Sequence, residues 1–83
     1  MRLKGTEIYR IPGDYFEYEL VPVFATCGRI FELRLMIEFS GANRSYCYVR
    51  YWDPEDAKMA IRRLHKFLIR PGYPLAVPQS VDN

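Results

Sequence analysis

The stretch RSYCYVRY, residues 44–51, alternates two kinds of side chain and has the composition of a β-strand. Successive side chains of a strand point to opposite faces of its sheet. One face would carry two small residues and a phenol ring, Cys47, Val49 and Tyr51. The other would carry two phenol rings and a cation, Tyr46, Tyr48 and Arg50. The first set suits a face covered by helices and the second an exposed face, so the stretch predicts a sheet that is covered on one side only.

The segments around this strand alternate between β and α patterns. We expect β-strands at 6–11, 29–39, 45–52 and 73–80, and a turn at 40–44 that joins the middle two as a hairpin. Helical spacing of apolar residues runs through 15–27 and 55–67. The order β-α-β-β-α-β predicts an α+β, ferredoxin-like fold, with a four-stranded antiparallel sheet and both helices on one face. We expect a single domain over residues 6–82, and leave open whether it is a piece of a longer protein.

End signals set the expected helix boundaries. Asp14, with Glu17 three residues later, has the spacing of a capping box, and Gly28 suits the end of the first helix. Asp53 followed by Pro54 marks the start of the second helix, which "RPG" at 70–72 would end. The first helix would bury one apolar face, made of Phe16, Leu20, Val23, Phe24 and Cys27.

Composition excludes several classes of protein. Of the 83 residues, 49% are hydrophobic and 27% charged, as in ordinary globular domains. The longest apolar runs are too short to span a membrane, and no signal peptide is visible. One histidine and two cysteines without metal-ligand spacing predict no metal and no cofactor. Cys27 and Cys47 are expected to be buried free thiols in a reducing compartment, the cytoplasm or the nucleus.

The exposed face predicted by residues 44–51 has the chemistry of a nucleic-acid surface. Two tyrosines two residues apart can stack successive bases, and flanking arginines can neutralise phosphates. A net charge of +2 is too small to indicate such a ligand by itself, so the placement of the charges carries the inference. The candidate binding residues on this face are Tyr9, Arg34, Met36, Arg44, Tyr46, Tyr48 and Arg50.

Residues 44–51 also resemble the octapeptide K/R-G-F/Y-G/A-F-V-x-F/Y of the RNA recognition motif. Six positions agree in chemical type, and Ser45 and Cys47 are small replacements for glycine and for glycine or alanine. The segments "ELVPVF", "GRIFELRLM", "FSGANR" and "IRPG" are similar to the first such motif of the hnRNP Q/R, apobec complementation factor and dead end group. The resemblance implies binding of single-stranded mRNA, often U- or AU-rich, with roles in editing, stability or translation, in several relatives in germ cells.

The first strand departs from this pattern. One alignment places Glu7 where the motif has an aromatic residue, and another, with two residues deleted, places Tyr9 there; both leave Tyr9 exposed. Glu7 would repel phosphate unless Arg34 or Arg50 neutralises it. Trp52 could stack a base as well, but we expect it to be buried where the strand meets the helix.

An enzyme and a protein-binding module are the two alternatives to RNA binding. An enzyme is not expected, because no anion-cradling loop and no pair of nucleophile and base is visible. The serious alternative is a module that binds a protein or a second copy of itself, since Tyr15, Phe16 and Tyr18 cannot all be core residues. His65 is expected to make a loop contact rather than bind a ligand. The cations of the second helix, Lys58, Arg62, Arg63 and Lys66, are expected to be solvated.

Overall fold

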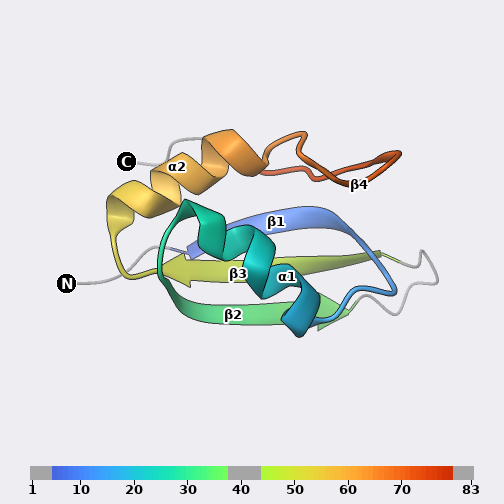
Figure 1. The fold of residues 1–83 in the computed structure, drawn as a ribbon, viewed down its shortest axis with the longest axis horizontal. Helices are drawn as coiled ribbons and strands as arrows, with labels where there is room; N and C mark the ends of the chain where they lie inside the picture. Colours follow the sequence, from blue (N-terminus) through green and yellow to red (C-terminus); the bar gives the residue numbers. More distant parts are fainter. Residues whose placement is uncertain (1–4, 38–43, 80–83) are drawn as a thin grey trace.

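The computed structural model describes residues 5–37 and 44–79, except for the side chains of residues 37 and 44 (Figure 1). Most of the turn predicted at 40–44, the end of the strand predicted at 29–39 and the end of the predicted domain lie outside the described residues. In chain order the elements are β1 (Gly5–Pro12), α1 (Glu17–Phe24), the 3-10 turn η1 (Ala25–Cys27), β2 (Ile30–Ile37), β3 (Arg44–Tyr51), α2 (Pro54–Leu64), β4 (Leu68–Arg70) and β5 (Tyr73–Pro74).

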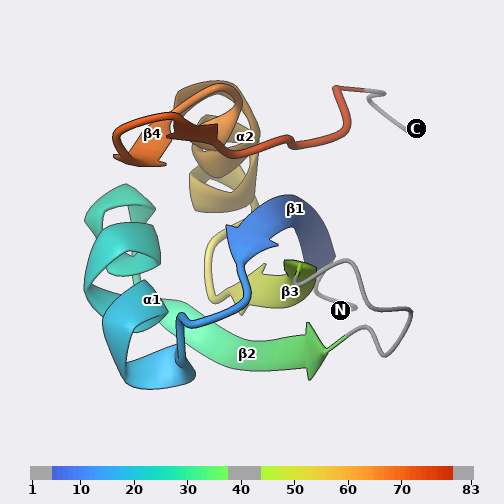
Figure 2. The same ribbon diagram turned by 90° about the vertical axis from the view of Figure 1, so that its right-hand side faces the viewer.

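The main sheet has the strand order β1-β3-β2, and both pairings are antiparallel. Figure 2 shows α1 and α2 on the same side of this sheet. The alternation predicted for β3 is confirmed: Ser45, Cys47, Val49 and Tyr51 are buried, whereas Tyr46, Tyr48 and Arg50 remain partly accessible. The strand therefore places its apolar residues under the helices and its larger polar side chains on the opposite face.

In place of the fourth strand predicted for the main sheet, the described part of the chain has a single β-bridge to β1. The backbones of Tyr9 and Ala76 exchange two hydrogen bonds, with N···O distances of 2.7 and 3.0 Å. Leu75 and Val77, on either side, donate their N–H groups to the Phe67 carbonyl and to Nδ1 of His65 instead. Pro74 and Pro78 have no N–H to donate, so the ladder cannot extend. The strand predicted at 73–80 is therefore largely wrong, while the loop contact expected of His65 is confirmed.

A β-bulge interrupts the pairing of β1 with β3 between Ile8 and Ile11. Ile8 lies opposite Cys47 and Ile11 opposite Ser45, so three steps along β1 match two along β3. The extra residue is Arg10, whose φ is 67°, in the left-handed region. Because the bulge absorbs one residue, both isoleucines point into the core and are fully buried.

The first helix begins later and ends earlier than predicted. Its N-cap is Phe16, and the Phe16 N–H donates to Glu19 Oε1 over 2.9 Å. Asp14 does not cap the helix; its carboxylate pairs with Arg70 at 3.0 Å, so the capping box predicted from Asp14 and Glu17 is wrong. As the N-cap, Phe16 stands at the helix end and is 51% exposed, which corrects its predicted place in the core. Cys27 lies in the 3-10 turn that follows α1.

The second helix starts where its signals indicate. The Asp53 carboxylate accepts a hydrogen bond from the Glu55 N–H at 2.9 Å, and Pro54 occupies the first turn. The helix ends at Leu64 rather than at 67, because Lys66 has a φ of 66° and its N–H donates to the Leu75 carbonyl. The following residues form β4, which pairs with β5 as a small hairpin. The predicted solvated cations are all exposed, Lys58, Arg62, Arg63 and Lys66.

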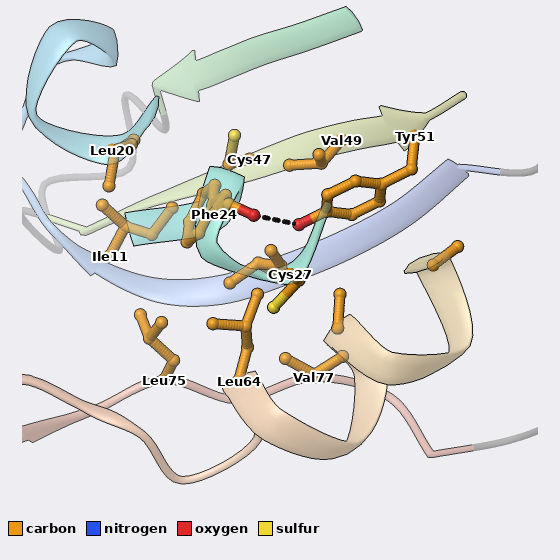
Figure 3. Close-up of a cluster of buried hydrophobic side chains, with 13 residues drawn as sticks. Ile11, Leu20, Phe24, Cys27, Cys47, Val49, Tyr51, Leu64, Leu75 and Val77 are labelled. Atoms are coloured by element: carbon orange, nitrogen blue, oxygen red, sulfur yellow. Dashed lines mark hydrogen bonds between the residues drawn. The ribbon is translucent and has the colours of Figure 1, made fainter. Parts of the chain in front are cut away.

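The core lies between the helices and the covered face of the sheet (Figure 3). At its centre the Tyr51 hydroxyl donates a 2.7 Å hydrogen bond to the Phe24 carbonyl at the end of α1. Burial raises the pKa of Tyr51, which keeps this donor protonated. The bond gives the carbonyl at the C-terminal end of α1 a donor from the sheet. Strand β3 is thereby tied to α1.

Both cysteines are buried and free, as predicted. Burial raises the pKa of the Cys47 thiol to about 12, and its side chain is fully shielded from solvent. Since the thiolate is the reactive form, native Cys47 is expected to react with an aromatic disulfide reagent at least about a hundredfold more slowly than the unfolded chain. Stopped-flow absorbance with and without denaturant measures both rates. A native rate for Cys47 within tenfold of the unfolded rate, determined with a Cys27→Ala variant, would contradict this burial.

Candidate nucleic-acid interface

The face of the β1-β3-β2 sheet opposite the helices, here called the open face, carries three short rows of side chains. The cross-strand register sets each row. From the start of β1 the first two rows are Gly5–Arg50–Glu32 and Glu7–Tyr48–Arg34. In the third row Met36 lies opposite Tyr46, and Tyr9 joins them through the stacking of its ring on Tyr46. The open face therefore joins three tyrosine rings, two arginines, two glutamates and a methionine.

Tyr9 and Tyr46 form a stacked pair. Their ring centroids are 5.3 Å apart and their planes differ by 26°. Tyr9 is 36% exposed and Tyr46 partly so, which leaves ring surface open to solvent. Sequence reasoning placed Tyr9 on the exposed side of its strand, and the structure confirms that position.

Tyr48 lies over the start of β1. A β-carbon at position 5 would collide with the Tyr48 ring, so the glycine lets the ring lie close above the backbone. Along its row Tyr48 stands between Glu7 and Arg34. The two tyrosines of β3 are thus supported differently, Tyr46 by another ring and Tyr48 by the bare backbone of Gly5.

Glu7 is the acidic residue of the open face that is expected from the sequence to repel phosphate. The Tyr9 hydroxyl donates to Glu7 Oε1 at 2.9 Å. This hydrogen bond raises the pKa of Tyr9 above its ordinary value, so the hydroxyl stays protonated. Among the described residues, neither Arg34 nor Arg50 forms an ion pair with Glu7. Its charge therefore remains on the surface beside the tyrosines.

Glu32 forms ion pairs with Arg34 and Arg50, the two arginines considered above as partners for Glu7. Glu32 Oε2 accepts from Arg34 Nε at 2.8 Å, and Glu32 Oε1 lies 2.7 Å from Arg50 Nη2. The Arg50 guanidinium holds the pKa of Glu32 below its ordinary value, with a smaller contribution from Arg34. Two guanidinium groups share one carboxylate, so a net positive charge remains here. Glu32 was missed by sequence reasoning, although its spacing of two from Arg34 puts both on one face.

The other candidate residues take the positions expected of their strands. Met36 lies opposite Tyr46 and is half-buried. Arg44 is the first residue of β3 and pairs by its backbone with Pro12, while its side chain lies outside the described part of the chain. Beyond the β1 edge, a groove of about 350 Å³ is lined by Gly5, Thr6, Glu7, Tyr48, Ile61 and Pro78.

The prediction that Trp52 is buried at the junction of β3 and α2 is wrong, because the residue is 50% exposed. The reason is its parity: Tyr51 fills the core, so the next residue points away from it. Its indole packs edge-on against Phe31, with ring centroids 4.5 Å apart and planes at 88°. Phe31, 42% exposed, was not among the predicted site residues.

Within residues 5–37 and 44–79, the structure contains no cluster of three or more histidine, cysteine or acidic residues that could hold a metal ion. No helix in that same part of the chain is long and apolar enough to cross a membrane.

A partly open antiparallel sheet, with two helices behind it and tyrosines and arginines in front, defines a small α+β binding module of the ferredoxin-like class. The sequence model of the RNA recognition motif matches residues 8–72, and the chain belongs to this family. The RNA recognition motif is a binding module, so the family assignment agrees with the prediction that this segment is not an enzyme.

Known proteins place the chain within this family. RNA-binding protein 47 of Danio rerio is 52% identical over 82 residues, which cover 96% of this chain and 14% of that protein. Probable RNA-binding protein 46 of Homo sapiens is 50% identical, over 96% of this chain and 15% of that protein. The structure of the Rna15 RRM with bound RNA (GU) superposes with a TM-score of 0.76 at 21% identity, over 94% of this chain and 83% of that one. The chain thus spans about one-seventh of the length of the curated relatives.

Proposed function

We propose that this domain binds single-stranded RNA on its open face. The observation that carries the proposal is the set of three tyrosine rings held side by side, Tyr9 stacked on Tyr46 and Tyr48 set over Gly5. Stacking of a base on an aromatic ring contributes about 1–3 kcal/mol and tolerates any base. The remaining candidates act with the rings: Met36 packs beside a base, and Arg34, Arg44 and Arg50 contact phosphates or base edges.

We also propose a biological setting for RNA binding by this domain. The resemblance to the hnRNP Q/R, apobec complementation factor and dead end group supports mRNA as the ligand, with U- or AU-rich segments preferred. It also supports a role in mRNA stability or translation, a site of action in the cytoplasm or nucleus, and expression in germ cells. The names of the relatives and the RNA bound to the Rna15 RRM agree with RNA as the ligand class.

A binding titration at two salt concentrations tests the proposal. Fluorescence anisotropy of a labelled U-rich strand of about ten nucleotides would report the dissociation constant. Three phosphate-binding arginines predict that the logarithm of the affinity falls with the logarithm of salt concentration with a slope of about −2. A wild-type domain with no measurable affinity at the lower salt concentration would refute the proposal.

A protein-binding module is the second candidate function, and one surface on α1 favours it. Phe16 and Tyr18 are 51% and 75% exposed, and their rings stack with centroids 6.0 Å apart and planes within 9°. This pair belongs to α1, on the covered side of the sheet (Figure 2), so the two functions can coexist. Light scattering tests self-association through this surface: a strictly monomeric mass at high concentration rules it out.

Removing the negative charge of Glu7 is expected to strengthen RNA binding. A Glu7→Gln variant keeps an acceptor for the Tyr9 hydroxyl but no longer repels phosphate. Two charges about 4 Å apart in water interact by about 1 kcal/mol, so the affinity should rise up to about fivefold at low salt and less at higher salt. The same titration measures this gain. A Glu55→Gln variant on α2, which lies on the other side of the sheet, is the control, and an equal gain there would show that position 7 has no special role.

A further inference from the structure

The open face carries a second aromatic cluster at the opposite end of β3. It consists of Phe31 and Trp52, whose rings pack edge to face. Trp52 directly follows β3, and Tyr48, Arg50 and Trp52 follow one another at intervals of two, so all three point to the open side of the sheet. The backbone N–H of Trp52 donates to the Arg29 carbonyl at 3.1 Å, which holds the backbone of Trp52 beside the start of β2.

A bulge in β2 brings Phe31 to the same side. Ile30 lies opposite Tyr51 and Glu32 opposite Arg50, so Phe31 is the extra residue of the pairing. Ile30 packs against the core, while the bulge leaves Phe31 42% exposed. Without the bulge, Phe31 and Glu32 could not both be accessible, because neighbouring residues of a regular strand point to opposite faces.

Cations surround the cluster. The Arg29 guanidinium lies over the Trp52 ring, 5.4 Å from its centroid, and the Arg50 guanidinium lies over the Phe31 ring at 5.0 Å. The acidic group next to them is Glu32, which already pairs with Arg34 and Arg50. The Asp53 carboxylate is directed away, to the first turn of α2. Exposed rings with guanidinium groups beside them can hold a base and the phosphate attached to it.

We propose that Phe31 and Trp52 form a second base-stacking platform, which binds a further nucleotide of the same RNA strand that covers Tyr46 and Tyr48. The proposal rests on the RNA-binding function proposed above and extends it. Trp52 follows Tyr48 by four residues, or roughly 13 Å along an extended strand, and Arg50 stands between them. The RNA strand therefore has to pass Arg50 to reach the second platform, and only a strand longer than the tyrosine site occupies both.

Trp52 is the single tryptophan of the chain, so its fluorescence reports directly on this platform. Oligouridylates of about four and about twelve nucleotides would be titrated into the wild-type domain. The longer strand is expected to quench the emission with the same dissociation constant that anisotropy gives, and the shorter strand is expected to bind without quenching. Unchanged emission on saturation with the longer strand would overturn the proposal, even if that strand binds tightly.

Variants provide a second and independent readout. Phe31→Ala combined with Trp52→Ala should weaken binding of the longer strand by about fivefold or more, the loss of one stacked base, and should leave the shorter strand within about twofold. Trp52→Phe should retain most of the affinity because it keeps a ring. Tyr18→Ala, which removes an exposed ring of α1, is the matched control, and circular dichroism checks that each variant is folded.

The outcomes separate this inference from the proposed function. If Tyr46→Ala with Tyr48→Ala abolishes binding but Phe31→Ala with Trp52→Ala has no effect at either length, the second platform does not exist and the first site stands. Equal losses at both lengths would place Phe31 and Trp52 within the first site and overturn the proposed extension. If the wild type binds neither strand, the RNA-binding function is refuted together with the inference.

Discussion

Replacing both Tyr46 and Tyr48 by alanine is expected to lower the affinity for U-rich RNA by at least about thirtyfold. Each ring stacks one base at about 1–3 kcal/mol, and the loss of two such contacts amounts to roughly 2–6 kcal/mol. The lower bound applies here because Tyr9 keeps its place on β1 and can still offer a ring. Neither tyrosine belongs to the buried core, so we expect the fold to survive both changes.

Anisotropy titrations of the wild type and the double variant at one fixed low salt concentration measure this loss. The matched control is Tyr18→Ala, which removes a tyrosine that is 75% exposed on α1. Unfolding midpoints in urea for all three proteins show whether a loss of binding comes from a loss of fold. A double variant that is folded and binds RNA within about threefold of the wild type would exclude these rings as the binding platform.

Replacing Phe24 by alanine is expected to reduce the free energy of unfolding by about 3–5 kcal/mol. The Phe24 side chain is fully buried at the end of α1, and its removal leaves a cavity between the helix and the sheet. An 83-residue domain has a total stability of roughly 4–12 kcal/mol, so this variant should lose at least about a quarter of that stability.

Urea unfolding followed by circular dichroism measures this change. Two comparison variants are expected to lose less stability. Val21→Ala, on the same helix but 41% exposed, should change the stability by less than about 0.5 kcal/mol. Tyr51→Phe removes the hydrogen bond to the Phe24 carbonyl and should cost about 0.5–1.5 kcal/mol. A Phe24→Ala variant as stable as Val21→Ala would mean that α1 does not pack on the sheet as described.

The order of the elements and the two faces of β3 could be predicted because both follow from local patterns. Alternation along 44–51 assigned Cys47, Val49 and Tyr51 to the core, and the structure buries all three. Asp53 and Pro54 marked the start of α2 for an equally local reason, since a side chain caps the helix from the adjacent residue. The positions of Tyr46 and Tyr48 on the open face followed from the same alternation. Their role in RNA binding stays a prediction.

The departures depend on partners that lie far apart in the sequence. Asp14 pairs with Arg70 rather than capping α1, and the N–H groups of Leu75 and Val77 bond to the loop after α2 rather than to β1. Neither choice can be read from neighbouring residues, because each depends on which group the fold brings within hydrogen-bonding distance.

The alternation of buried and accessible side chains follows from the amino-acid sequence, since a period of two is a property of any extended backbone. The tertiary structure sets which of the accessible side chains meet. It stacked Tyr9 on Tyr46, gave Glu32 both arginines and, through one bulge in β2, set Phe31 against Trp52. Such contacts depend on cross-strand register and on bulges, which arise when strands pair and not from any one strand alone.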